Sequence, residues 1–217
     1  MSDVETNTVV VVSGGDPPAA SAARRLPEGA FVIAADAGIV HGLALGLEVG
    51  LAVGDMDSVT AEGLEAVSAA GARIESHPRA KDQTDLELAL DRAVELGARR
   101  LVVLGSDGGR LDHLLGLALL LGLDRYAAVS IEARLGPTRV TVVRSTSELH
   151  GHQGDIVSLL PVHGGVEGVT TAGLVYPLLD EDLAAGTTRG ISNEMAGPVA
   201  TVHLRQGVLL ALQPGAV

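Results

Sequence analysis

The stretch LAVGDMDSV, residues 51–59, is a short apolar run that ends in two carboxylates, Asp55 and Asp57. Apolar residues without polar alternation are typical of a strand buried on both faces of a sheet. Amphipathic segments separate this run from similar ones, and that alternation predicts a parallel α/β sheet with helices on its faces. The other predicted strands are 8–12, 30–35 and 100–105, and the predicted helices are 17–25, 38–46, 60–70, 84–97 and the very apolar 111–123.

The pattern changes from about residue 138 onward. The runs there are short, rich in Val and Thr, and separated by Gly, Pro and His: RVTVVRS, DIVSLLPV, GVEGVTTAG, VATVHLR and GVLLAL. They predict an antiparallel β-sandwich or small barrel, with RQG (205–207) as a tight hairpin between the last two runs. We therefore expect an α/β domain over 1–137 and a smaller antiparallel β-sandwich domain over 138–217, with the boundary in ARLGPT (133–138).

Composition limits the class of function. The chain of 217 residues has 27 acidic and 15 basic residues, a formal net charge of −12, which argues against binding to nucleic acid or an anionic membrane. There is no cysteine, so disulfides and thiolate metal sites are excluded. The longest apolar stretch, 114–123, is about half the length that spans a bilayer, and MSDVETNTVVVV has no signal-peptide pattern. We expect a cytoplasmic protein.

Acidic and glycine residues follow the predicted strands. SGGD, DAG, GDMDS and GSDGGRLDH each come directly after one, so Asp16, Asp36, Asp55, Asp57, Asp107 and Asp112 should gather at the carboxyl edge of the sheet. Carboxylates gathered in this way repel one another unless a cation lies among them, and without cysteine the expected ion is Mg²⁺ or Mn²⁺.

A phosphate cradle is also present in the sequence. DGGR (107–110) offers glycine amides beside Arg110, and Lys81 precedes a helix start marked by the capping box of Thr84 and Glu87. Carboxylates, a divalent cation, Arg, Lys and glycine-rich turns are the components of phosphoryl-group transfer. The sequence contains neither a P-loop nor the glycine-rich loop of protein kinases, so a nucleotide would be held in another way.

Three acidic motifs in this order, GDMDS, KDQTDLELAL and GGRLDH, resemble the thiamine pyrophosphokinase family. The second half agrees, since TAGLVYPL, LAAGTTRGISNE and GVLLAL are similar to the small β domain of that family. The resemblance implies transfer of a diphosphate group from ATP to the hydroxyethyl group of thiamine, giving thiamine diphosphate and AMP. It further implies Mg²⁺ as cofactor and a homodimer with active sites at the subunit interface.

The resemblance also implies roles for individual residues. Asp55, Asp57 and Asp82 would hold the metal, Asp85 would complete the metal and phosphate site, and one of the acidic residues would orient the attacking hydroxyl. Lys81 and Arg110 would neutralise phosphate charge. The residues on the nucleotide side are expected to be Asp36, Ser58, Thr84, Gly109, Arg110, Asp112 and His113. The residues that contact thiamine are expected to be Tyr176, through its ring, and Ser192 and Asn193, through hydrogen bonds to the pyrimidine.

Two other functions stay open at this point. A related pyrophosphokinase would act on another alcohol, such as a hydroxymethylpterin, and a non-catalytic protein would only bind the nucleotide or thiamine. Departures from the family pattern bear on the first of these. Relatives commonly have DGGA where this chain has DAGI (36–39), Pro-Asp where it has Val49-Gly50, and Asn where it has Leu117.

Overall fold

The computed structural model describes residues 8–217 and divides them into two compact units. The first unit ends at Leu114 and resumes over Ala128–Gly136, and the second comprises Leu115–Ala127 and Pro137–Val217. Residues 1–7 lie outside the described residues. They form most of the segment MSDVETNTVVVV, on which the expectation of no signal peptide rests.

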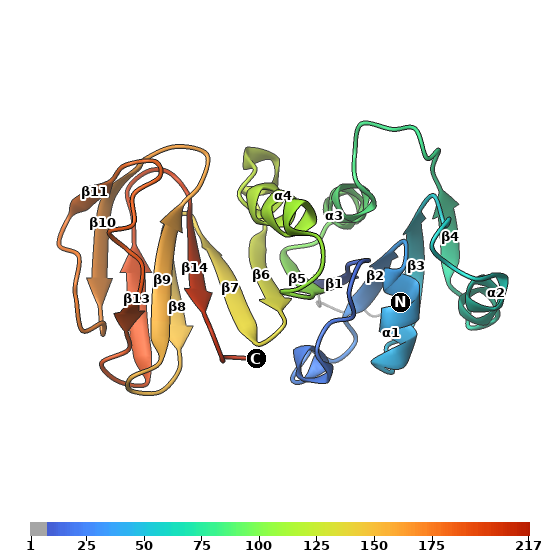
Figure 1. Cartoon of the computed structure of the whole chain (residues 1–217), viewed down its shortest axis with the longest axis horizontal. Helices are drawn as coiled ribbons and strands as arrows, with labels where there is room; N and C mark the ends of the chain where they lie inside the picture. Colours follow the sequence, from blue (N-terminus) through green and yellow to red (C-terminus); the bar gives the residue numbers. More distant parts are fainter. Residues whose placement is uncertain (1–7) are drawn as a thin grey trace. The chain divides into compact units, whose positions relative to one another are not determined.

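The first unit is built on six parallel strands in the order β6-β5-β1-β2-β3-β4 (Figure 1). This confirms the predicted parallel α/β architecture. The strands are β1 (Thr8–Val12), β2 (Phe31–Ala35), β3 (Val49–Gly54), β4 (Arg73–Ser76), β5 (Arg100–Gly105) and β6 (Ser130–Leu135). Strands β4 and β6 were not predicted, because β4 is a short, polar edge strand and β6 carries charged side chains at Glu132 and Arg134.

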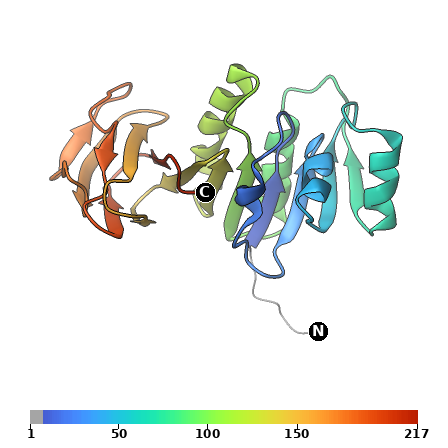
Figure 2. The same cartoon turned by 60° about the horizontal axis from the view of Figure 1, so that its bottom comes forward.

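The helices match the sequence pattern except at one place. They are α1 (Gly38–Ala44), α2 (Ala61–Ala69), α3 (Asp85–Glu95) and α4 (Leu111–Leu121), with the 3-10 turns η1 (Ala20–Ala23) and η2 (Asp124–Tyr126). Helices α1 and α3 cover opposite faces of the sheet (Figures 1 and 2). The predicted helix over 17–25 is wrong: Pro17 and Pro18 precede a single 3-10 turn, and the chain is extended again at Arg24.

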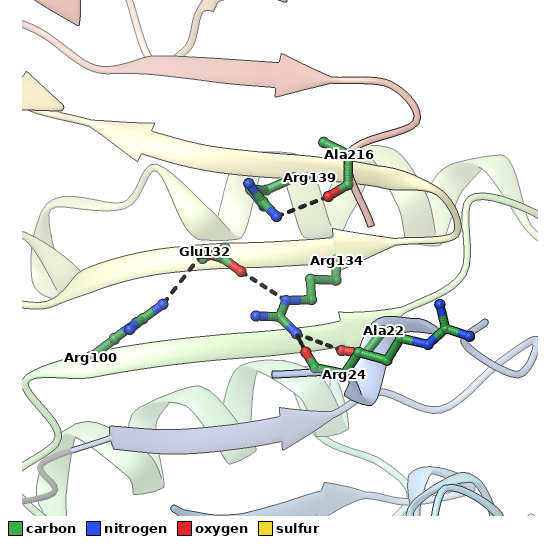
Figure 3. A network of polar contacts seen from close by, with 7 residues as sticks. All are labelled: Ala22, Arg24, Arg100, Glu132, Arg134, Arg139 and Ala216. Atoms are coloured by element: carbon green, nitrogen blue, oxygen red, sulfur yellow. Dashed lines mark hydrogen bonds and ion pairs between the residues drawn. The ribbon is translucent and has the colours of Figure 1, made fainter. Parts of the chain in front are cut away.

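A buried arginine fastens η1 to the sheet (Figure 3). Arg134 on β6 donates from Nη1 to the carbonyls of Ala22, at 2.8 Å, and Arg24, at 2.7 Å. Its Nε donates to Glu132, which also pairs with Arg100. Two carbonyls and one carboxylate therefore compensate the cost of burying the guanidinium.

The second unit contains two antiparallel sheets around one core. One has the order β12-β9-β14-β7 and the other β11-β10-β13-β8. Buried residues from both sheets, such as Leu159 on β9 and Val202 on β13, share a single hydrophobic cluster, as in the predicted sandwich. The strands are β7 (Thr138–Val143), β8 (Thr146–His150), β9 (Ile156–Pro161), β10 (Val166–Ala172), β11 (Glu181–Leu183), β12 (Asn193–Glu194), β13 (Val199–His203) and β14 (Leu209–Gln213).

The predicted RQG hairpin is wrong. Strand β13 pairs with β8 and β10, whereas β14 pairs with β7 and β9, so the connection crosses from one sheet to the other. Leu204 and Val208, at the two ends of the connection, are buried, and Gln206 forms a bridge with Glu167. Among the residues described, no helix has the length and apolar character needed to cross a membrane.

Candidate active site

Three carboxylates meet at the carboxyl edge of the parallel sheet. Because β2 and β3 run in parallel with Ala35 beside Val53, the residues that follow them leave the sheet together. One carboxylate oxygen from each of Asp36, Asp55 and Asp57 lies within 4.8 Å of the other two. We call these three residues the carboxylate cluster.

The backbone at the cluster is held in an unusual conformation. Asp36 (φ 45°) and Met56 (φ 60°) adopt the left-handed region that residues with a side chain seldom occupy. The N–H of Asp36 donates to the carbonyl of Val53 at 2.9 Å, and the N–H of Asp57 donates to Asp55 Oδ1 at 3.1 Å. Such strained positions concentrate at functional sites, where the surrounding structure enforces them.

Gly54 lets two carboxylates approach the end of β3. A Cβ added to Gly54 would lie 3.0 Å from Asp85 Oδ1 and 3.2 Å from Asp36 Cβ, and its φ of +149° favours glycine. Asp85, in the first turn of α3, is thus brought to the cluster through the space that this glycine leaves open.

Lys81 neutralises part of this charge. Its Nζ lies 3.0 Å from Asp85 Oδ1 and 3.6 Å from Asp55 Oδ2, and it donates to the carbonyl of Pro78 at 3.1 Å. Burial lowers the pKa of Lys81, but the hydrogen bond and the attraction of Asp85, together with Asp55, outweigh burial and raise that pKa. The N–H of Asp57, followed by Lys81, holds the pKa of Asp55 below its usual value.

The donor set fits a hard divalent cation. The cluster offers oxygen atoms alone, and Asp36 Oδ1 is buried without a hydrogen-bond partner. A buried, unpaired carboxylate oxygen is costly unless a cation compensates it. Oxygen donors of this kind match Mg²⁺, which proteins hold through one or two carboxylates and substrate phosphates.

A second group of loops lies at the ends of β1 and β5. The carboxylate of Asp16 lies against the GSDGG turn, so that a Cβ on Gly109 would come within 3.0 Å of Asp16 Oδ2. Arg110 pairs with Asp112 through Nη2 and Oδ2 at 2.6 Å, and both side chains are exposed. The hydrogen bond and charge of Arg110 lower the pKa of Asp112 to about 2.

Other predicted residues occupy the surroundings of the cluster. Ser58 donates its hydroxyl to Asp57 Oδ1 at 3.1 Å. Thr84 caps α3 by accepting from the N–H of Glu87 at 3.2 Å, as its capping-box pattern predicts. Asp82 and His113 are exposed, and Asp82 lies outside the carboxylate cluster, in which Asp36 takes a place instead.

Two residues near the cluster were missed from the sequence. The guanidinium of Arg79 lies 3.3 Å from Asp57 Oδ2, and its position two residues before Lys81 was the signal available. Gly54 was the other, and its place directly before Asp55 gave no hint of a steric role.

The departures at DAGI and Leu117 fit the structure. Ala37 has an ordinary φ of −55°, so this position does not require glycine. Gly38 does, because an added Cβ would lie 2.2 Å from the carbonyl oxygen of Val12. Leu117 is buried on α4, so this departure concerns packing. Val49 and Gly50 begin β3, at the end of the strand opposite the cluster, and Gly50 packs against the Phe31 ring.

The predicted thiamine-binding residues lie together in the second unit. Tyr176 is 58% exposed in the connection between β10 and β11, and Ser192 precedes β12 with a φ of 58°. Asn193, only 7% exposed, accepts from the N–H of Tyr176 at 3.0 Å and donates to its carbonyl at 2.7 Å. The structure thus joins Tyr176 to the GISNE segment.

Comparison with known proteins agrees with both units. Residues 23–131 match the family model "Thiamin pyrophosphokinase, catalytic domain", and residues 141–209 match "Thiamin pyrophosphokinase, vitamin B1 binding domain". The chain is 30% identical over 185 residues to the thiamine pyrophosphokinase of Bacillus subtilis, covering 83% of this chain and 86% of that protein.

Solved structures show the same likeness. The crystal structure of thiamine pyrophosphokinase from Bacillus subtilis superposes with a TM-score of 0.84 at 26% identity, covering 97% of this chain and 100% of that one. The structure of the enzyme from Geobacillus thermodenitrificans gives 0.80 at 30% identity, covering 95% and 97%. With both family models matched in order over most of its length, the chain belongs to the thiamine pyrophosphokinase family.

Proposed function

We propose that this protein is an ATP-dependent diphosphotransferase that converts thiamine and ATP into thiamine diphosphate and AMP. The carboxylate cluster carries the proposal, because Asp36, Asp55 and Asp57 bring three oxygen donors together within the segment that matches the catalytic domain. The matched vitamin B1 binding domain favours thiamine over a pterin alcohol as acceptor. A protein that only senses nucleotide has little need for the strained acidic turns described above.

We propose Mg²⁺ as the metal, held by the carboxylate cluster beside Asp85, with Asp82 as a further oxygen donor. When bound, this ion would neutralise charge on the phosphate oxygens. Lys81, Arg79 and Arg110 supply the remaining positive charge, and the GSDGG turn supplies backbone N–H groups for the nucleotide side. The nucleotide side is proposed to be lined by Asp112, His113, Ser58 and Thr84. Of these, Thr84 also caps α3 and Asp112 also pairs with Arg110.

In the proposed reaction, the oxygen of the thiamine hydroxyethyl group attacks the β-phosphorus of ATP as the bond to the AMP oxygen breaks. One carboxylate at the cluster orients the hydroxyl and accepts its proton. The chain contributes mainly position and charge, as is usual for phosphoryl transfer. Tyr176 is proposed to offer its ring to the cationic thiazolium, and Ser192 to hydrogen-bond the pyrimidine.

We propose further that the enzyme works in the cytoplasm as a homodimer with active sites at the subunit interface. In support of self-association, Leu111, Leu115 and Leu119 are exposed at successive turns of α4. An apolar stripe of this kind is usually covered by a partner. Light scattering should give a dimer for the wild type and a monomer for Leu115→Glu; a wild-type monomer at working concentration would contradict the proposal.

The reaction is tested by incubating the purified protein with ATP, MgCl₂ and thiamine and separating the products by chromatography. We expect thiamine diphosphate and AMP in equal amounts. Asp57→Ala should abolish turnover while circular dichroism shows the fold retained, and Asp124→Ala, which removes an exposed carboxylate paired with Arg144, should not. Formation of ADP instead of AMP would contradict diphosphate transfer.

A further inference from the structure

The side chain of Asn193 is committed to the backbone of Tyr176. Its Oδ1 accepts the N–H of Tyr176 at 3.0 Å and the N–H of Glu194 at 2.9 Å, and its Nδ2 donates to the carbonyl of Tyr176 at 2.7 Å. Both backbone polar groups of Tyr176 are therefore held by one buried amide. The amide has little capacity left for another partner.

The surrounding bonds make this connection rigid. Asn193 pairs with Val157 of β9 through its backbone, and the N–H of Val175 donates to the carbonyl of Glu194 at 2.9 Å. On the far side of Tyr176, Leu178 and Thr171 exchange two hydrogen bonds, one from each backbone N–H. Pro177 further restricts the backbone on both sides of the bond that it forms.

The side chain that this framework carries is exposed. Tyr176 is 58% accessible, and its neighbours Val175 and Pro177 are exposed as well. The buried amide of Asn193 thus bonds to the backbone of an exposed aromatic residue. Its effect is to fix the place from which the ring is presented, which reduces the entropy lost when a ligand binds there.

We propose that Asn193 is a positioning residue, which holds the Tyr176 ring ready for the organic substrate instead of bonding that substrate itself. The proposal rests on the proposed function and refines it. Direct polar contact then falls to Ser192, which is exposed next to Asn193. In this role Asn193 acts on substrate affinity through Tyr176.

Two substitutions test the role. Asn193→Asp keeps the shape and the acceptor but loses the donor to the Tyr176 carbonyl. Asn193→Ser removes both bonds to the Tyr176 backbone. We expect KM for thiamine to rise about tenfold in each, with kcat within about twofold of the wild type. Gln213→Glu is the matched control, because Gln213 is also a buried amide that donates to a backbone carbonyl, that of His150. Its KM should stay at the wild-type value.

A double-mutant cycle distinguishes positioning from contact. If Asn193 acts through Tyr176, the double variant Tyr176→Ala/Asn193→Ser should have the same KM as Tyr176→Ala alone. Effects that multiply would show that Asn193 contacts thiamine directly and would overturn the proposal. An unchanged KM in both single variants of a protein that forms AMP would overturn it too.

A substrate-free measurement completes the test. The chain has two tyrosines, Tyr126 and Tyr176, so protein labelled with ¹⁵N-tyrosine gives two amide signals. Asn193→Ser should shift the Tyr176 signal and speed its exchange with solvent while the Tyr126 signal stays fixed. An unmoved Tyr176 signal would overturn the positioning role of Asn193. Failure of the wild type to convert thiamine would instead overturn the proposed function. The role of Asn193 in binding thiamine would then fall as well, whereas its effect on the Tyr176 amide signal would remain.

Discussion

Lys81 Nζ lies 3.0 Å from Asp85 Oδ1, four positions along the chain in the first turn of α3, and Lys81 is the single lysine of this protein. Every other member of its 15 lysine and arginine residues is arginine. A lysine ammonium is a compact charge with three donors, whereas a guanidinium is a flat fork. The three acceptors around Nζ, from Asp85, Asp55 and Pro78, converge on one point, and this arrangement suits the ammonium.

Lys81→Arg should therefore fail to replace lysine although it keeps the charge. We expect kcat to fall on the order of 100-fold in both variants, because Lys81→Arg displaces the positive charge from the proposed phosphate site and Lys81→Met removes it. Steady-state kinetics check this, and Arg99→Lys, the reverse exchange at an exposed position, should leave kcat unchanged. Full activity in Lys81→Arg would show that charge alone is sufficient.

Gly54→Ala should disturb the cluster itself. The added Cβ would press on Asp85 and Asp36 and would hold the backbone in a conformation that alanine disfavours, at a cost of about 1–3 kcal/mol of folding free energy. We expect a lower Tm and a smaller rise in Tm on adding MgCl₂. Gly46→Ala is the matched control, since Gly46 also has a positive φ but nothing within 4 Å of an added Cβ. A full response to MgCl₂ in Gly54→Ala would contradict the steric role.

The Arg110–Asp112 pair should contribute to stability in a defined pH range. The pKa of Asp112 is lowered from 3.8 to about 2 in the folded chain, so its contribution is present above pH 3.8 and is lost as the pH falls toward 2. In Asp112→Asn this loss is absent. The difference in Tm between wild type and Asp112→Asn should therefore shrink between pH 4 and pH 2; a constant difference would contradict the ion pair.

Local sequence signals predicted much of the first unit. Neighbouring residues are enough to predict buried strands such as 51–54 and the cap at Thr84. Of the acidic residues expected at one edge of the sheet, Asp36, Asp55 and Asp57 lie together. Strand β4 and the role of Gly54 were not predictable in this way, because each depends on which distant residue is adjacent. Asp36 was predicted at this edge but not among the metal ligands, and the β2–β3 register brings its oxygen into the cluster.

In the second unit, the sequence predicted the strands better than their pairing. The segment 205–207 has the composition of a tight turn, yet the buried Leu204 and Val208 direct β13 and β14 into different sheets. Asn193 shows the same limit for the site. Its motif pointed to thiamine, whereas its contacts are with the backbone of Tyr176, a residue 17 positions away.

Arg134→Met should show what the buried arginine of β6 contributes. The variant keeps the stem of the side chain but removes the donor to the carbonyls of Ala22 and Arg24 and to the carboxylate of Glu132. We expect a loss of about 3 kcal/mol in the free energy of unfolding, measured by urea denaturation. Arg99→Met, at an exposed position directly before β5, should cost less than about 0.5 kcal/mol.

The destabilisation caused by Arg134→Met should first appear as local opening near η1, before the whole chain unfolds. Because the guanidinium holds the segment between β1 and β2, hydrogen exchange should increase first at residues 19–25, including the N–H of Arg24 that bonds to Ser21. Exchange in β9 and β14 of the second unit should stay slow under native conditions. A uniform increase in hydrogen exchange across both units would contradict a local role of Arg134 at η1. The loss of stability would then belong to the sheet as a whole.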